Sequence, residues 1–220
     1  MHHAMWFAET TKKLGHEKAY MILDQVSSQS YSVQLKRLSN VLGFEIENNF
    51  PKKAINLSDE NLYELCKGMA LNWLANDGIW FQNIEFSSGM EDAKHCNDAS
   101  WAQFSPFEAW SIKRLLGMTR NPGLDGLKQS MSYRLYAFIN KQSITEETSN
   151  SFIFRMNDCR VQSARKRKNL ADYPCKSAGI IEYSEFAKAI DTRIQTECIC
   201  CPPDNHPETY YCAWKFSIEP

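Results

Sequence analysis

Apolar residues in the first two thirds of the chain recur at intervals of three and four, which is the spacing of one face of an α-helix. The clearest stripe follows Ser58, a residue suited to cap a helix N-terminus, and predicts a helix to about Phe86. The periodicity also predicts a helical section over residues 1–57 that contains a helix ending at Gly43. Further predicted helices cover residues 91–104, 106–117 and 124–140.

The pattern changes after residue 150. Residues 152–154 and 212–218 are rich in β-formers, and apolar side chains in the second segment alternate, which predicts one buried strand face. That face would carry Cys212, Trp214, Phe216 and Ile218. Residues 193–199 are predicted to form a partner strand, residues 161–168 and 183–190 to be helical, and residues 141–150 to form a loop or hairpin-like link.

This order of elements predicts an α+β fold, in which a helical N-terminal half packs on a small C-terminal unit of helices and antiparallel sheet. We expect an N-terminal helical extension over residues 1–57 and a single α+β domain over residues 58–220. Within that domain, residues 58–140 would be helical and residues 151–220 would form a cysteine-rich α/β part.

The composition narrows the choice of partners. The 220 residues carry a formal net charge of −1, so no global field draws the chain to nucleic acid or to a membrane. No apolar run approaches the roughly 20 residues of a membrane helix, and the first residues lack the features of a signal peptide. We therefore expect a cytoplasmic protein that binds a small molecule, with a homodimer left open.

Six of the eight cysteines lie after residue 158, and in a reducing cytoplasm such thiols more often bind metal or do chemistry than form disulfides. Cys198 and Cys201 form a C-x-x-C pair that can aim two sulfurs at one ion. Zinc is the default metal, and iron or an iron–sulfur cluster is the alternative. Inert core thiols and redox thiols remain open. The predicted ligands are Cys159, Cys175, Cys198, Cys201 and Cys212.

Cys159 is the best candidate for a nucleophile. It lies between Asp158 and Arg160, with a basic run at residues 165–168, and nearby cations lower the pKa of a thiol. Arg160 or Arg165 could hold the acid group of a substrate. Cys159 could equally be a metal ligand or a packed thiol.

His206 is the histidine nearest the cysteines, where it could ligate metal or act as a general base. Its setting between prolines, beside Asp204, is equally consistent with an exposed loop. The catalytic candidates are therefore Cys159, Asp158 and His206.

The helical half offers a second group of candidates. Trp80 and Trp110, together with Glu85, could line a pocket for a ligand. Carboxylates there, including Glu108, could instead be structural partners of arginines such as Arg134. Core packing alone would also explain the aromatic residues.

The C-terminal part contains four short segments that combine cysteine, aromatic and charged residues: 154–160 (FRMNDCR), 173–176 (YPCK), 197–204 and 211–216. With residues 72–85 of the helical half, they resemble an uncharacterised family of prokaryotic cytosolic proteins. The resemblance covers roughly residues 58–218 and brings no activity with it.

The three separated cysteines Cys159, Cys175 and Cys212 more distantly resemble those of the L-2-amino-thiazoline-4-carboxylic acid hydrolase family, which opens a cyclic thiazoline at a carbon–nitrogen bond. The same tail is similar to the 4-vinyl-reductase-type ligand-binding domain, an α/β module linked to small-molecule sensing. The Cys-Ile-Cys-Cys-Pro-Pro run at residues 198–203 departs from the shorter glycine-containing turn expected in both.

These observations favour a zinc-binding protein that hydrolyses a C–N bond of a small cyclic carboxylate containing sulfur or nitrogen. The alternative is a non-enzymatic sensor or binding module with a structural metal site.

Overall fold

The computed structural model of the chain describes residues 2–167, 169 and 171–219. The chain divides into two compact units, Met1–Leu65 and Cys66–Pro220, and each is described by itself. The division falls inside the long helix α4 (Asp59–Ser88). The predicted α+β class is confirmed, because most helices precede the four-stranded antiparallel sheet.

The first unit is mainly helical, as predicted. Gly43 ends its longest helix with a left-handed φ of 72°, which glycine adopts at little cost, and its N–H donates to the carbonyl of Ser39. The rings of Phe7 and Tyr20 stack with centroids 6.0 Å apart. Its elements are α1 (His2–Leu14), α2 (His16–Leu42), β1 (Ile46–Glu47), β2 (Phe50–Pro51) and α3 (Lys52–Ile55).

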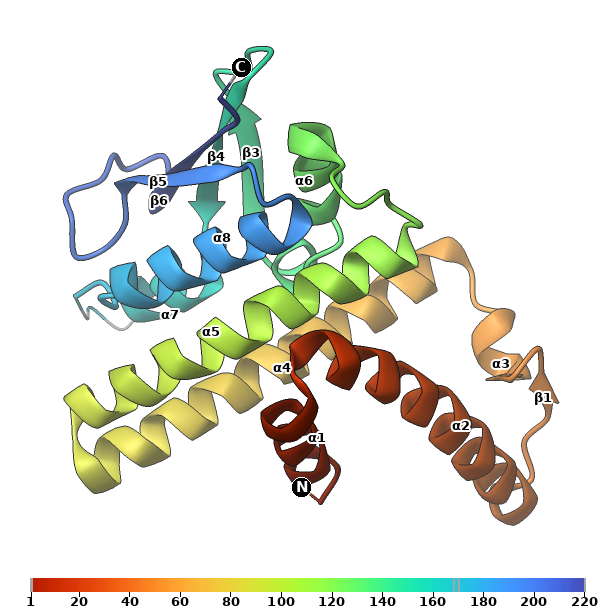
Figure 1. The fold of residues 1–220 in the computed structure, drawn as a ribbon. Coiled ribbons are helices and arrows are strands. Elements are labelled where there is room, and N and C mark those ends of the chain that lie inside the picture. The colour runs from red at the N-terminus through yellow and green to blue at the C-terminus, as the bar shows by residue number, and fades with distance from the viewer. Residues whose placement is uncertain (1, 168, 170, 220) are drawn as a thin grey trace. The chain divides into compact units, whose positions relative to one another are not determined.

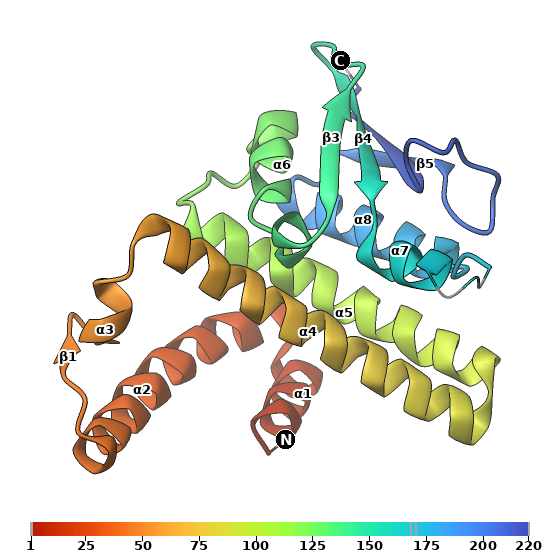
Figure 2. The same cartoon turned by 180° about the vertical axis from the view of Figure 1, so that it is seen from behind.

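In the second unit, a central helix lies between a long helix and the sheet. Figures 1 and 2 show α8 (Lys176–Ile190) running between α5 (Met90–Leu115) and the strands. The remaining elements are α6 (Gly123–Met131), the 3-10 turn η1 (Leu135–Phe138), β3 (Lys141–Thr145), β4 (Ser151–Asp158), α7 (Arg160–Arg167), β5 (Gln195–Cys200) and β6 (Cys212–Ser217).

The sheet has the strand order β3-β4-β6-β5, and all neighbouring strands are antiparallel. The predicted face of β6 is confirmed for Cys212, Trp214 and Phe216, which are all buried, whereas Ile218 lies after the strand and is partly buried. The alternation is incomplete, because Ala213 is buried as well. Phe154 and Phe152 of β4 stand opposite Trp214 and Phe216, so two adjacent strands present one continuous apolar face.

Helix α8 covers that face with residues spaced for one side of a helix, namely Tyr183, Phe186, Ala187 and Ile190. The ring of Tyr183 stacks on Trp214 with centroids 4.7 Å apart. Apolar burial of this kind contributes about 25 cal/mol for each Å² removed from water, so this layer stabilises the fold.

One helix boundary was wrongly predicted at Pro106. The structure has a single helix, α5, with Pro106 inside it. Proline removes one backbone donor from a helix interior. Ala109 and Ile112, one and two turns further on, are buried in the core that α8 shares, and this packing holds the helix together across the proline.

The predicted helix over residues 124–140 was also wrong, because α6 ends at Met131 and only η1 follows. Between them Arg134 takes an extended conformation, with φ −67° and ψ 148°, and its side chain is buried. Residues 141–145 form the edge strand β3, which pairs antiparallel with β4. Of the two predictions for residues 141–150, the hairpin-like link is therefore confirmed and the plain loop is not.

Two other boundaries differ by a few residues. Helix α8 begins at Lys176, seven residues before the predicted start. Helix α7 reaches Arg167, whereas Lys168, the predicted end, lies outside the described residues.

Candidate functional site

The second unit contains a cavity of about 340 Å³ whose walls come from α4, α5, α7, α8 and the sheet. Most of its lining is apolar or aromatic, with carboxylates, amides and thiols placed among the rings. The aromatic residues are Phe81, Trp101, Tyr136, Tyr173, Tyr183 and Trp214, and the charged residues are Asp77, Glu85, Glu182 and Arg165.

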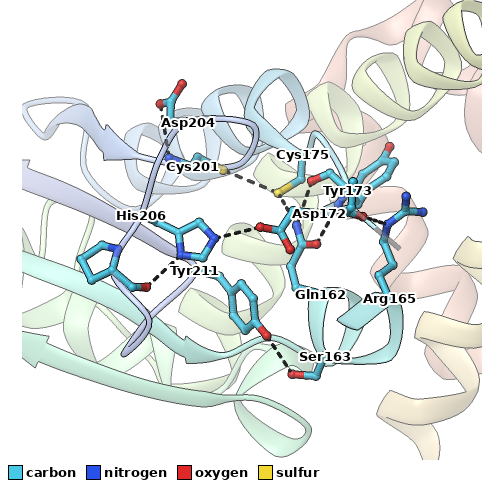
Figure 3. A network of polar contacts seen from close by, with 12 residues as sticks. Gln162, Ser163, Arg165, Asp172, Tyr173, Cys175, Cys201, Asp204, His206 and Tyr211 are labelled. Carbon is cyan, nitrogen blue, oxygen red and sulfur yellow. Dashed lines mark hydrogen bonds and ion pairs between the residues drawn. The ribbon is translucent and has the colours of Figure 1, made fainter. Parts of the chain in front are cut away.

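Four thiols line this one cavity although they come from four separate segments. Cys159 precedes α7, Cys175 precedes α8, Cys201 follows β5, and Cys212 begins β6. The sulfurs of Cys175 and Cys201 are 3.6 Å apart (Figure 3). The thiol of Cys212 contributes, with that of Cys175, to raising the pKa of Cys201.

Gln162 positions Cys175. Its side chain is 1% exposed, and its Nε2 donates both to the carbonyl of Tyr173, at 2.8 Å, and to the sulfur of Cys175, at 3.4 Å. Its Oε1 accepts a 2.8 Å hydrogen bond from the backbone N–H of Tyr173 (Figure 3). One buried amide therefore fixes the segment before α8 against α7.

Cys201 is held by a second set of contacts. Its backbone N–H donates to Asp204, whose carboxylate also accepts a 2.7 Å hydrogen bond from Lys176 at the start of α8. A Cβ at Gly179 would lie 2.8 Å from the Trp214 ring and 3.6 Å from the sulfur of Cys201. Only glycine at this position lets α8 approach the thiols so closely.

The thiols have different acidities. Burial raises the pKa of Cys159 to about 12, although the N–H groups of Gln162 and Val161 bond to its sulfur and act in the opposite direction. The expectation of a lowered pKa at Cys159 is therefore wrong, because desolvation outweighs the basic residues nearby in sequence. The hydrogen bond with Cys201 lowers the pKa of Cys175.

A buried arginine joins two carboxylates beside the cavity. Arg134 Nε donates to Glu108 at 2.8 Å, and its Nη2 donates to Glu182 at 2.7 Å. Glu108 is thus a structural partner of Arg134, which is one of the alternatives that the sequence left open. Burial raises the pKa of Glu182 to about 7 against the opposing effect of Arg134, and Glu182 is the member of this triad that lines the cavity.

The carboxylates on α4 are not paired in this way. Asp77 and Glu85 line the cavity eight residues apart, on one face of the helix. Within the part of the chain that the structure describes, neither carboxylate has a hydrogen-bonded or ion-paired side chain. Burial raises the pKa of Asp77.

Several predicted site residues are not part of the cavity lining. Trp80 lines a neighbouring hollow of about 510 Å³ between α4 and α5, which shares Asp77, Phe81, Asn97 and Trp101 with the cavity. Trp110 packs beside the guanidinium of Arg114. Arg160 is exposed, and Asp158 accepts a hydrogen bond from Ser163. Those that the structure does place on the cavity are Cys159, Cys175, Cys201, Cys212, Glu85 and Arg165.

Cys198 does not line the cavity, although Cys201 does. A bulge separates Cys198 from Cys200 in β5, and Cys201 leaves the strand on the side of α8. Cys198 instead packs at the edge of the core, where burial raises its pKa to about 11. Cys198 and Cys201 therefore do not line the same cavity, and their predicted pairing on one ion stays a prediction.

His206 also lies away from the cavity lining and has a structural contact instead. Its Nε2 is 2.9 Å from the carboxylate of Asp172, and its Nδ1 is 2.9 Å from the carbonyl of Pro207 (Figure 3). Burial lowers the pKa of His206, but these contacts outweigh it and the net change is upward. The pair ties the loop after β5 to the segment before α8.

No group of three His, Cys, Asp or Glu side chains in the described ranges has a ready-made arrangement for holding a metal ion. Two of the thiols, Cys175 and Cys201, instead lie within hydrogen-bonding distance of each other. None of the helices in the same ranges is long and apolar enough to cross a membrane.

Several lining residues were not predicted from the sequence, among them Gln162, Glu182 and Tyr136. Gln162 and Glu182 lie in helices with many polar positions, and no local pattern distinguishes those that turn inward. Tyr173 entered the sequence analysis only as part of segment 173–176, which resembles other proteins.

Fold and site together define an α+β domain with one thiol-lined cavity between its helices and its sheet. The chain belongs to DUF6125, a family of unknown function that matches residues 52–218. No curated protein and no solved structure matches the chain. The expected resemblance to an uncharacterised family is thereby confirmed, and no activity follows from it.

Proposed function

We propose that this domain binds a small molecule in the cavity and a metal ion, zinc by default, through Cys159, Cys175, Cys201 and Cys212. The observation that carries the proposal is that these four thiols, from four segments, all line the same cavity. Core cysteines serve packing equally well when they are dispersed, so packing alone gives no reason for them to gather.

The spacing of the sulfurs supports a shared ion. Two thiolates on one tetrahedral zinc, with bonds of about 2.3 Å, lie about 3.8 Å apart. The Cys175 and Cys201 sulfurs are 3.6 Å apart. The described arrangement suits protonated thiols that bond to each other, and rotation of their side chains would direct the sulfurs to an ion that replaces those protons.

The remaining lining supports a small-molecule ligand. A volume of about 340 Å³ falls in the range of roughly 300–1,000 Å³ found for ligand pockets. The indole N–H of Trp214 is buried and has no acceptor among the described residues. An acceptor atom of a ligand or a water would satisfy it.

Metal analysis of protein purified without added metal, from zinc-supplemented cells, tests the proposal. We expect about one zinc per chain, with bound thiols released by a chelator. Cys201→Ser and Cys175→Ser should each lower the content below about 0.2 per chain.

Cys200→Ser is the matched control, because Cys200 is buried and adjacent to Cys201 but does not line the cavity. A wild-type protein without metal would refute the proposed metal site. So would a Cys201→Ser variant that keeps its zinc. Hydrolysis of a C–N bond, implied by the distant resemblance, stays a prediction until a substrate is found.

A further inference from the structure

Carboxylates outnumber cations among the side chains that line the cavity, and two of the carboxylates have no paired side chain in the described part of the chain. Three carboxylates, Asp77, Glu85 and Glu182, line it with a single cation, Arg165. Glu182 is already bonded to Arg134, and Arg165 Nε already donates to a backbone carbonyl. Asp77 and Glu85 are left without a hydrogen-bonded or ion-paired side chain among the described residues, so the cavity presents unbalanced negative charge.

Aromatic rings stand beside these carboxylates. Phe81 lies one turn from both Asp77 and Glu85 on the same face of α4. Its ring meets Tyr173 edge to face, with centroids 5.2 Å apart. The faces of such rings attract cations, because their π-systems are negative above and below the plane.

The chain itself shows that this aromatic group accepts a cation. The ammonium of Lys94 lies 5.6 Å from the centre of the Tyr173 ring while donating to the carbonyl of Pro174. Lys94 is not among the lining residues and does not pair with Asp77 or Glu85.

We propose that the cavity selects an organic cation, a protonated amine or nitrogen heterocycle, whose charge lies between Asp77, Glu85 and the aromatic rings. A half-buried carboxylate without a partner is costly, and a bound cation would remove that cost. This inference rests on the proposed function in one respect, namely that the cavity binds a small molecule. It does not depend on the metal ion. It also replaces the carboxylate substrate expected from the sequence.

Three probes that share one ring and differ in charge test the inference on the full chain. They are benzylamine, benzyl alcohol and benzoate, titrated at pH 7 and followed by saturation-transfer NMR. We expect benzylammonium to bind about tenfold more tightly than benzyl alcohol, because only the cation gains from the rings and the carboxylates. Benzoate should bind most weakly.

Asp77→Asn should lower the affinity for benzylammonium by about five- to tenfold and leave that for benzyl alcohol unchanged. Glu85→Gln should act in the same direction. Asp92→Asn is the control, because Asp92 is exposed on α5 and is not part of the lining. Circular dichroism establishes that each variant is folded.

Preferential binding of benzoate would overturn the inference and indicate that Arg165 sets the selectivity. Binding that is unaffected by Asp77→Asn would also overturn it, as would the failure of all three probes to bind. Metal content separates the two proposals: Asp77→Asn should keep its zinc, whereas Cys201→Ser should lose zinc whatever the amine preference is.

Discussion

At the scale of single residues, the site depends on a few positions where neighbouring side chains pack so closely that no larger residue fits. Gly179 is the clearest case, since any side chain there would press on Trp214 and on Cys201. Trp214 is 1% exposed and stacks on Tyr183, so the indole cannot move aside without disturbing the core.

Gly179→Ala is therefore expected to lower the free energy of unfolding by about 1–3 kcal/mol, although alanine is the better helix former. Gly78→Ala is the matched control, because a Cβ at Gly78 of α4 meets nothing within 4 Å. That change should raise stability by about 0.5–1 kcal/mol. Urea unfolding followed by tryptophan fluorescence measures both, and equal effects would contradict the packing argument.

The sequence predicted that the clustered cysteines belong to a site, but it did not predict the residues that contact them. Cysteine clustering in the sequence indicated four of the residues on the cavity wall. Gln162, by contrast, acts through contacts 11 and 13 residues away, and its inward position depends on the packing of α7. Cys198 was expected beside Cys201, but a bulge in β5 changes which side chains leave the strand together.

At the scale of elements, two charged residues join the ends of three helices. Lys113 of α5 donates to the carbonyls of Ile190 and Arg120, at 2.7 and 2.8 Å. Asp191, directly after α8, accepts a 2.9 Å hydrogen bond from the backbone of Gly123 at the start of α6. These contacts satisfy backbone groups that helix ends leave without partners.

Asp191 should make stability depend on acid pH. Hydrogen bonds from Arg193 lower the pKa of Asp191 to about 2. Its charged form therefore stabilises the folded chain above about pH 4, and that contribution, about 2 kcal/mol, is lost as the pH falls toward 2. The stability difference between wild type and Asp191→Asn should shrink by about 1 kcal/mol between pH 6 and pH 3 in urea unfolding.

Asp92→Asn, at an exposed position, serves as the reference and should show no such pH-dependent difference. A constant gap between wild type and Asp191→Asn across this range would mean that the carboxylate of Asp191 is not stabilised by folding.

The hydrophobic periodicity predicted most of the elements because it reflects burial along a regular backbone. It failed where a single side chain decides the backbone path. Arg134 interrupts the helical pattern because its guanidinium reaches two buried carboxylates, and Pro106 fails to interrupt it because packing outweighs one lost donor. Neither outcome can be predicted from local sequence.

At the scale of the whole molecule, the buried core cluster belongs to the second unit. Its residues lie between Ala109 and Phe216, and they surround α8. The family match, residues 52–218, covers all of them.

A fragment of residues 52–220 should therefore fold by itself and unfold in one cooperative transition. Five of the six tryptophans lie in it, so tryptophan fluorescence in urea reports on its core. The fragment should also keep the metal content and amine preference of the full chain. A fragment without a sigmoidal transition would show that the core needs residues 1–51.

The order of the strands has a consequence for biosynthesis. β6 lies between β4 and β5, yet it is the last of the three to leave the ribosome. Until residue 217 emerges, β4 and β5 have no common neighbour, and the apolar face for α8 is incomplete. Cys212 lies on the same strand, so the four thiols of the cavity lining come together only after β6 has paired with β4 and β5. Until β6 is synthesised, the apolar face of α8 and the unpaired edges of β4 and β5 are therefore exposed to aggregation with other chains.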